Sequence, residues 1–238
     1  RRSLLPLKGN LVVAATVAEE NGRSVGVHQL LDETLPEMEL EPDQAVLGEP
    51  TELDLYYGHD GWLELKVRID GEDRFQVDDA AGAVYRDLHS DYSVGADNRE
   101  HLYLHGPQVA EKDGRHRATI RMDRRLGDSE DPAEVARRVR HTAARAAQAT
   151  GAVAVEVDVA EEDQRLYTGR TITVRNVTHA WSTDPFDPLV ERSREALSAA
   201  GCDAKPGKWH LDRLRMGTAG SVMVEEYDLP AVGYGPGS

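Results

Sequence analysis

Near both ends of this 238-residue chain, apolar residues form short continuous runs. Residues 11–17 and 229–234 are typical of strands buried on both faces of a parallel sheet, and residues 45–47 form a similar run. Between residues 11–17 and 45–47, Ser24 precedes a helical pattern that continues to Leu31. The two ends of the chain therefore predict an α/β arrangement with a mainly parallel sheet.

The middle of the chain follows a different pattern. Apolar and polar residues alternate over 62–69, 118–122 and 153–159, as expected for strands with one exposed face. Helices are predicted around 80–88 and after Asp131, where proline follows the aspartate and glycine ends the pattern twenty residues later. This stretch predicts an α+β layer of antiparallel strands and two helices.

The last part of the chain returns to the first pattern. A helix is predicted from Pro188, with Asp187 as its cap and Gly201 after its end. We therefore expect an α/β domain made of residues 1–57 and 181–238. It is interrupted by an inserted α+β domain made of residues 58–180.

The charge of the chain limits its partners. Forty-three acidic residues against 28 basic ones give a formal net charge of −15, which disfavours binding to nucleic acid or to an anionic membrane. No apolar run approaches the roughly 20 residues that span a bilayer, and no signal peptide is recognised, so a cytoplasmic location is expected. The single cysteine, Cys202, excludes an internal disulfide framework and a cysteine-rich zinc site. The scarcity of lysine fits either a salt-rich cytoplasm or a GC-rich genome.

Three glutamates follow the buried runs. Glu19 and Glu20 come directly after residues 11–17, and Glu49 follows residues 45–47. Open α/β sheets place their sites at the carboxyl ends of strands. Three carboxylates meeting there would repel one another unless a cation lay between them, so a divalent metal with one glutamate as general base is one interpretation. Solvated loop glutamates are the alternative.

Five segments, in order, resemble the motifs of one family. They are residues 12–20 (VVAATVAEE), 46–51 (VLGEPT), 58–65 (GHDGWLEL), 122–126 (MDRRL) and 230–237 (PAVGYGPG). The family is the metal-dependent amidohydrolases and peptidases that include acetylornithine deacetylase, succinyl-diaminopimelate desuccinylase, aminoacylase and carboxypeptidase G. Residues 167–169, 208–209 and 217–220 resemble a subgroup of it that is linked to selenium metabolism.

The resemblance implies a fold and a set of roles. It implies a metal-binding α/β domain interrupted by a ferredoxin-like lid domain through which a homodimer forms. Glu19 matches the general base, and Glu20 and Glu49 match ligands of two zinc or cobalt ions. Arg125 matches a lid arginine that holds the substrate carboxylate, and Gly235 matches a substrate-binding position. The implied reaction is cleavage of an amide bond in an N-acyl amino acid or small peptide by a metal-activated water.

The chain also departs from the family pattern. Two upstream ligand motifs and a downstream histidine of the family have no counterpart, so we expect a chain truncated at both ends. Phe75 stands where the family has a lid histidine that stabilises the oxyanion. These departures favour an alternative, in which the chain is a non-catalytic fragment or homologue that acts as a dimerising or binding module.

Overall fold

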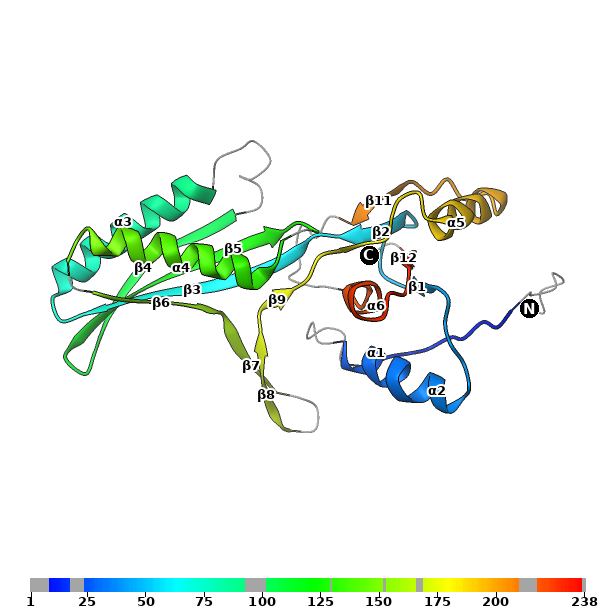
Figure 1. The fold of residues 1–238 in the computed structure, drawn as a ribbon, viewed down its shortest axis with the longest axis horizontal. Helices are drawn as coiled ribbons and strands as arrows, with labels where there is room; N and C mark the ends of the chain where they lie inside the picture. Colours follow the sequence, from blue (N-terminus) through cyan, green and yellow to red (C-terminus); the bar gives the residue numbers. More distant parts are fainter. Residues whose placement is uncertain are drawn as a thin grey trace.

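The computed structural model describes residues 9–17, 24–92, 102–128, 130–151, 153–165, 169–209 and 218–236, and arranges them around two main sheets (Figure 1). The helices are α1 (Val25–Gln29), the π-helical segment η1 (Leu30–Thr34), α2 (Leu35–Glu37), α3 (Arg74–Tyr92), α4 (Pro132–Gln148), α5 (Pro188–Ala199) and α6 (Gly220–Tyr227). The strands are β1 (Ala45–Leu47), β2 (Leu55–His59), β3 (Gly61–Gly71), β4 (Leu102–Lys112), β5 (Arg115–Leu126), β6 (Ala154–Val159), β7 (Glu161–Arg165), β8 (Thr171–Arg175), β9 (Val177–Thr178), β10 (Trp181–Ser182), β11 (Pro206–Trp209) and β12 (Ala231–Gly233).

The first sheet, called here the mixed sheet, has the strand order β1-β12-β2-β10, with β11 also paired to β2. The pairs β1–β12 and β2–β11 are parallel, whereas β12–β2 and β10–β2 are antiparallel. The α/β class is confirmed, but this sheet is mixed where the sequence predicts a mainly parallel one. The reason is that β2 leads directly into the second sheet and β10 returns beside it in the opposite direction.

The predicted strand at residues 11–17 is not found. Val13 is 88% exposed, and Leu11 and Val17 are exposed as well. Within the described residues no strand pairs with this segment. At its end, the carbonyl of Val17 accepts a hydrogen bond from the N–H of Gly26 at 3.2 Å. An apolar run becomes a buried strand only where neighbours bind its N–H and C=O groups and cover its side chains.

The second sheet, called here the antiparallel layer, has the order β4-β5-β3-β6 with every neighbour antiparallel. Helices α3 and α4 lie side by side on one face (Figure 1). The alternation predicted at residues 62–69 is confirmed, because Leu63, Leu65, Val67 and Ile69 are all buried under the helices. The predicted layer of antiparallel strands and two helices is therefore present.

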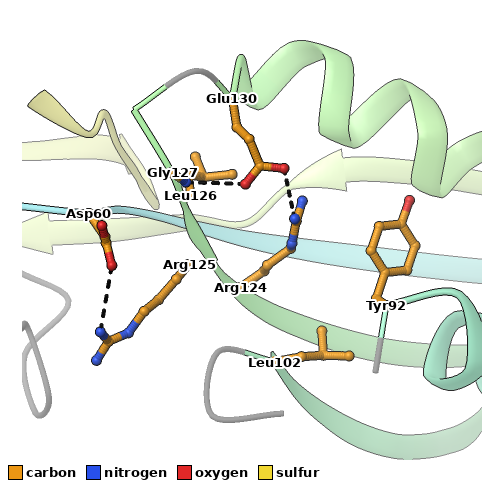
Figure 2. A pocket seen from close by; sticks show the side chains of 8 residues that line it. All are labelled: Asp60, Tyr92, Leu102, Arg124, Arg125, Leu126, Gly127 and Glu130. Carbon is orange, nitrogen blue, oxygen red and sulfur yellow. Dashed lines mark hydrogen bonds and ion pairs between the residues drawn. The ribbon is translucent and has the colours of Figure 1, made fainter. Parts of the chain in front are cut away.

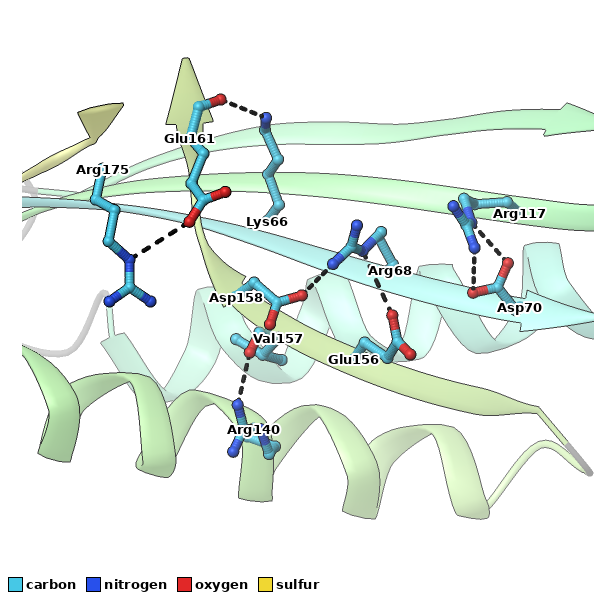
Figure 3. Close-up of polar contacts among 10 residues, drawn as sticks. All are labelled: Lys66, Arg68, Asp70, Arg117, Arg140, Glu156, Val157, Asp158, Glu161 and Arg175. Carbon is cyan, nitrogen blue, oxygen red and sulfur yellow. Dashed lines mark hydrogen bonds and ion pairs between the residues drawn. The ribbon is translucent and has the colours of Figure 1, made fainter. Parts of the chain in front are cut away.

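The opposite face of the antiparallel layer is charged (Figure 3). Arg117 binds Asp70 through two hydrogen bonds, of 2.7 and 3.1 Å. Arg68 forms ion pairs with Asp158 and, at 3.7 Å, with Glu156. Solvent screens exposed ion pairs of this kind, so each contributes little to the stability of the fold. They keep one face of the sheet polar while the other packs against helices.

Local capping sets the helix ends, and the sequence predicts most of it. The Asp131 carboxylate accepts a hydrogen bond from the N–H of Ala133 at 2.8 Å, and Asp187 caps α5 in the same way. Ser24 is an exception. Its φ is +45° and its side chain makes no capping bond; the backbone carbonyl of Ser24 accepts from Val27 and His28 instead. None of the helices in the described residues is long and apolar enough to cross a membrane.

Two passages of chain join the two sheets, at residues 59–61 and 178–181. They run side by side, with His59 opposite Trp181 and Trp62 opposite Thr178. A Cβ on Gly58 would lie 2.3 Å from the carbonyl oxygen of Trp181, and one on Gly61 would lie 2.5 Å from that of Thr178. Only glycine permits this approach of the two backbones.

Candidate functional site

Glu49 and Gly235 lie against each other at one edge of the mixed sheet. Glu49 follows β1 and Gly235 follows β12, and these strands are parallel, so their carboxyl ends share an edge. A Cβ on Gly235 would stand 2.0 Å from the backbone oxygen of Glu49. The glycine is therefore required for the two segments to meet.

Buried Thr51 fastens these two segments together. Its hydroxyl oxygen accepts a hydrogen bond from the N–H of Gly235 at 2.9 Å. The N–H of Leu53 donates to the Gly235 carbonyl at 3.0 Å. Backbone groups thus fix the half-buried Glu49 beside the loop that follows β12. Two residues that the sequence singles out separately are in contact in the structure.

Of the other predicted metal-site residues, Glu19 and Glu20 lie outside the described residues, and their roles stay predictions. In the ranges that the structure describes, no three His, Cys, Asp or Glu side chains are grouped closely enough to hold a metal ion. Glu49 follows β1 at the carboxyl end of the strand, and its role as a metal ligand stays a prediction. One carboxylate does not by itself define a metal centre.

Arg125 is the residue before the last of β5 in the antiparallel layer and faces Asp60 (Figure 2). Its Nη1 atom is 3.9 Å from Oδ2 of Asp60. The arginine side chain is only 9% exposed, whereas the Asp60 side chain is 31% exposed. The structure thus brings two predicted residues together, Glu49 and Gly235, and places Arg125 against Asp60, which the sequence did not single out.

A small cavity of about 210 Å³ lies beside Arg125. Its lining residues are Asp60, Tyr92, Leu102, Arg124, Arg125, Leu126, Gly127 and Glu130. Arg124 points away from Arg125, donates to Glu130 at 2.7 Å, and stacks over the Tyr92 ring at 5.5 Å from its centroid (Figure 2). The charge of Arg124 is therefore engaged within the cavity wall.

His59, which precedes Asp60 in the chain, is fully buried, and sequence reasoning did not single it out. The N–H of Thr218 donates to His59 Nε2 at 3.0 Å, so Nε2 must be the unprotonated nitrogen. Nδ1 then carries the hydrogen and donates to the Asp60 carbonyl at 2.8 Å. Burial lowers the pKa of His59, against the opposing effects of its bond to Asp60 and the charges of Asp60 and Asp128. The ring is held neutral between the two passages.

A flanking pair of glycines was the available signal for these residues. Gly58 and Gly61 bracket His59 and Asp60, and two glycines so close together indicate a close backbone approach. The pattern does not say which side chains meet there. That depends on the second passage, more than a hundred residues later in the chain.

The structure describes Phe75 and some of the residues in the subgroup motifs. Phe75 lies in the first turn of α3 and is 80% exposed. Lys208 forms an ion pair with Asp128, which joins the mixed sheet to the antiparallel layer. Tyr167, Thr168 and Gly217 lie outside the described residues. The link to the selenium-metabolism subgroup stays a prediction.

The fold is similar to that of solved peptidase structures. A tripeptidase from Staphylococcus aureus is 14% identical over 92% of this chain and 54% of its own, with a TM-score of 0.58. The YXEP protein of Bacillus subtilis, described as a dinuclear metal-binding peptidase of the M20 family, is 14% identical over 92% of this chain and 53% of its own, with a TM-score of 0.55.

A third solved structure extends the range of functions that accompany this fold. The aminobenzoyl-glutamate utilization protein of Klebsiella pneumoniae is 15% identical over 92% of this chain and 55% of its own, with a TM-score of 0.53. No family model and no curated protein matches the sequence. The chain spans a little more than half the length of these three solved proteins. At these identities the likeness establishes the fold alone.

Proposed function

We propose that the protein is a metal-dependent hydrolase that cleaves the amide bond of an N-acyl amino acid or small peptide. The observation that carries the proposal is the contact between Glu49 and Gly235 at the carboxyl edge of β1 and β12. It unites two of the sequence motifs that resemble the amidohydrolase family. It does so within a fold shared with solved metallopeptidases over 92% of the chain.

Each predicted residue has a role in this proposal. Glu20 and Glu49 would be ligands of two divalent ions, zinc or cobalt, whose chemical contribution would be activation of a water molecule. Glu19 accepts the proton of that water as general base. Arg125 binds the carboxylate of the substrate, for which the planar guanidinium is suited. Gly235 keeps the loop after β12 close to Glu49 and so leaves room for substrate backbone.

The test measures metal and turnover separately. The chain is dialysed against zinc or cobalt, its bound metal is counted, and hydrolysis of a panel of N-acetyl amino acids is followed. Tightly bound divalent metal, up to the two ions of a two-metal hydrolase, would support the proposal. Glu49→Gln should lose bound metal. Glu19→Gln should keep its metal and lose about 10²-fold or more in turnover.

The matched control for these variants is Glu191→Gln, which makes the same change at an exposed position on α5. It should change neither metal content nor turnover. If the wild-type chain binds no metal tightly and hydrolyses nothing in the panel, the proposal fails. The alternative of a non-catalytic binding module would then hold.

We also propose that two copies associate through the antiparallel layer as a homodimer. In the described part of the chain, β4 and β6 each have one strand neighbour, so the outer edge of each can pair with another chain. Tyr103 on β4 is 54% exposed and adds apolar surface at one edge. Sedimentation equilibrium should give about twice the chain mass of 26.2 kDa. A monomer at high concentration would contradict the proposal.

A further inference from the structure

The contact between Asp60 and Arg125 suggests an internal competitor for a bound carboxylate. Arg125 Nη1 and Asp60 Oδ2 are 3.9 Å apart, which is beyond hydrogen-bond distance. A carboxylate that bound the guanidinium in bidentate fashion would approach to about 2.7 to 2.9 Å. Asp60 therefore balances the charge of Arg125 without forming a close bidentate ion pair. A ligand carboxylate that forms such a pair can replace Asp60.

The backbone holds Asp60 in place for this contact. His59 Nδ1 donates to the Asp60 carbonyl at 2.8 Å. Gly58 and Gly61 lie on either side and press closely against the second passage. The Asp60 carboxylate thus projects from a fixed backbone position at the cavity wall (Figure 2). Holding Asp60 there requires little further loss of conformational freedom.

Arg124 is paired with Glu130 in the cavity wall. Arg125 is therefore the arginine for which a ligand anion would compete with Asp60. Arg124 is bound to Glu130 at 2.7 Å, and Glu130 also accepts from the N–H of Gly127 at 3.1 Å. Two arginines and two acidic residues therefore balance within the lining. A carboxylate entering the cavity meets the negative charge of Asp60, the more exposed partner, beside the buried Arg125.

We propose that Asp60 is a specificity-determining residue that competes with ligand carboxylates for Arg125 and so weakens their binding. The inference rests on the proposed function, because it takes Arg125 as the carboxylate-binding residue. It adds that carboxylate ligands must displace Asp60, whereas neutral amides need not. Removal of the Asp60 charge should therefore favour anionic ligands selectively.

The experiment uses binding to the full chain and needs no turnover. N-acetylglycine and its neutral analogue N-acetylglycinamide are titrated into wild type and Asp60→Asn by calorimetry. Asp60→Asn should bind N-acetylglycine roughly three- to tenfold more tightly, on the scale of a partly buried ion pair. Binding of N-acetylglycinamide should not change. Asp70→Asn, which removes the partner of Arg117 on the same sheet, is the matched control (Figure 3).

A second measurement applies to the wild-type protein and does not depend on a variant that folds. The side-chain carboxyl ¹³C resonance of Asp60 should shift on addition of N-acetylglycine and stay in place with N-acetylglycinamide. Equal or weaker binding of N-acetylglycine by Asp60→Asn, or an unmoved Asp60 resonance at saturation, would overturn the inference. Absence of bound metal or of turnover would contradict the proposed function. The binding of N-acetylglycine could still be compared between wild type and Asp60→Asn.

Discussion

At the scale of single residues, His59 shows how burial decides a protonation state. Its Nε2 accepts the N–H of Thr218, and Trp181 donates its indole N–H to the Thr218 hydroxyl at 3.0 Å. A proton on Nε2 would face the N–H of Thr218 and break that hydrogen bond. Burial lowers the pKa of His59 below its ordinary value of 6.5, so the native protein favours the neutral ring.

This shift predicts the pH dependence of stability. The unfolded chain binds the proton at higher pH than the native one, so stability rises with pH across this window. The contribution of His59 is complete above about pH 6.5, and it is lost as the pH falls toward the lowered pKa of the native state. Urea unfolding at pH 5 and pH 7.5 measures the difference in the free energy of unfolding.

A matched pair of variants isolates the contribution of His59. His59→Gln should be less stable than wild type by about 1 to 3 kcal/mol at pH 7.5, because buried partners lose a hydrogen bond. It should also show a smaller loss between pH 7.5 and pH 5. His141→Gln, at an exposed position on α4, should behave like wild type. An equal pH dependence in wild type and His59→Gln would show that His59 does not titrate in this range.

At the scale of elements, structures set by adjacent residues could be predicted from the sequence. Strands that depend on neighbouring strands could not. Adjacent residues predict the start of α4, and Asp131 caps the helix as expected. The strand β4 was missed because Gly106 and Pro107 interrupt it, a pair that normally indicates a turn. The register of β4 shifts at that point, and an edge strand tolerates a proline that a central strand would not.

Residues 11–17 are the opposite case. They carry the apolar pattern of a buried strand, yet in the described part of the structure no strand lies beside them. Strand formation depends on neighbours that a local pattern cannot supply. The β7–β8 hairpin was missed for a related reason. Strand β7 is wholly polar and so carries no apolar pattern, and the alternating strand β8 is only five residues long (Figure 1).

One contact of the candidate site could be predicted from local sequence patterns, and the other could not. Glu49 and Gly235 each follow an apolar run, and parallel pairing of those runs brings them together, so their meeting follows from the pattern. The Asp60–Arg125 contact depends on how β2, β3 and β5 meet at the junction of the two sheets. Neither the spacing nor the composition of the sequence encodes that geometry.

At the scale of the whole molecule, the side chain of Asp128 links the two sheets. Asp128 follows β5 in the antiparallel layer. Its carboxylate accepts from the Ser182 hydroxyl at 2.9 Å and forms an ion pair with Lys208, and both of these residues belong to the mixed sheet. Asp128 lies four residues before the start of α4 at Pro132. It lies beside the passages at residues 59–61 and 178–181, where a small rotation would change the separation of Glu49 and Arg125.

The last prediction is that Asp128 restrains the rotation of the two sheets. Spin labels at His141→Cys on α4 and Arg194→Cys on α5, in a Cys202→Ser background, report their separation by pulsed electron resonance. Asp128→Asn and Lys208→Met should each broaden the distance distribution. A partly exposed ion pair contributes about 1 kcal/mol, so any rotated arrangement should gain roughly fivefold in population. Glu134→Gln, which removes an ion pair within α4, should leave the distribution unchanged. If both junction variants keep the wild-type distribution, the two backbone passages alone fix the arrangement, and access to Arg125 does not depend on Asp128.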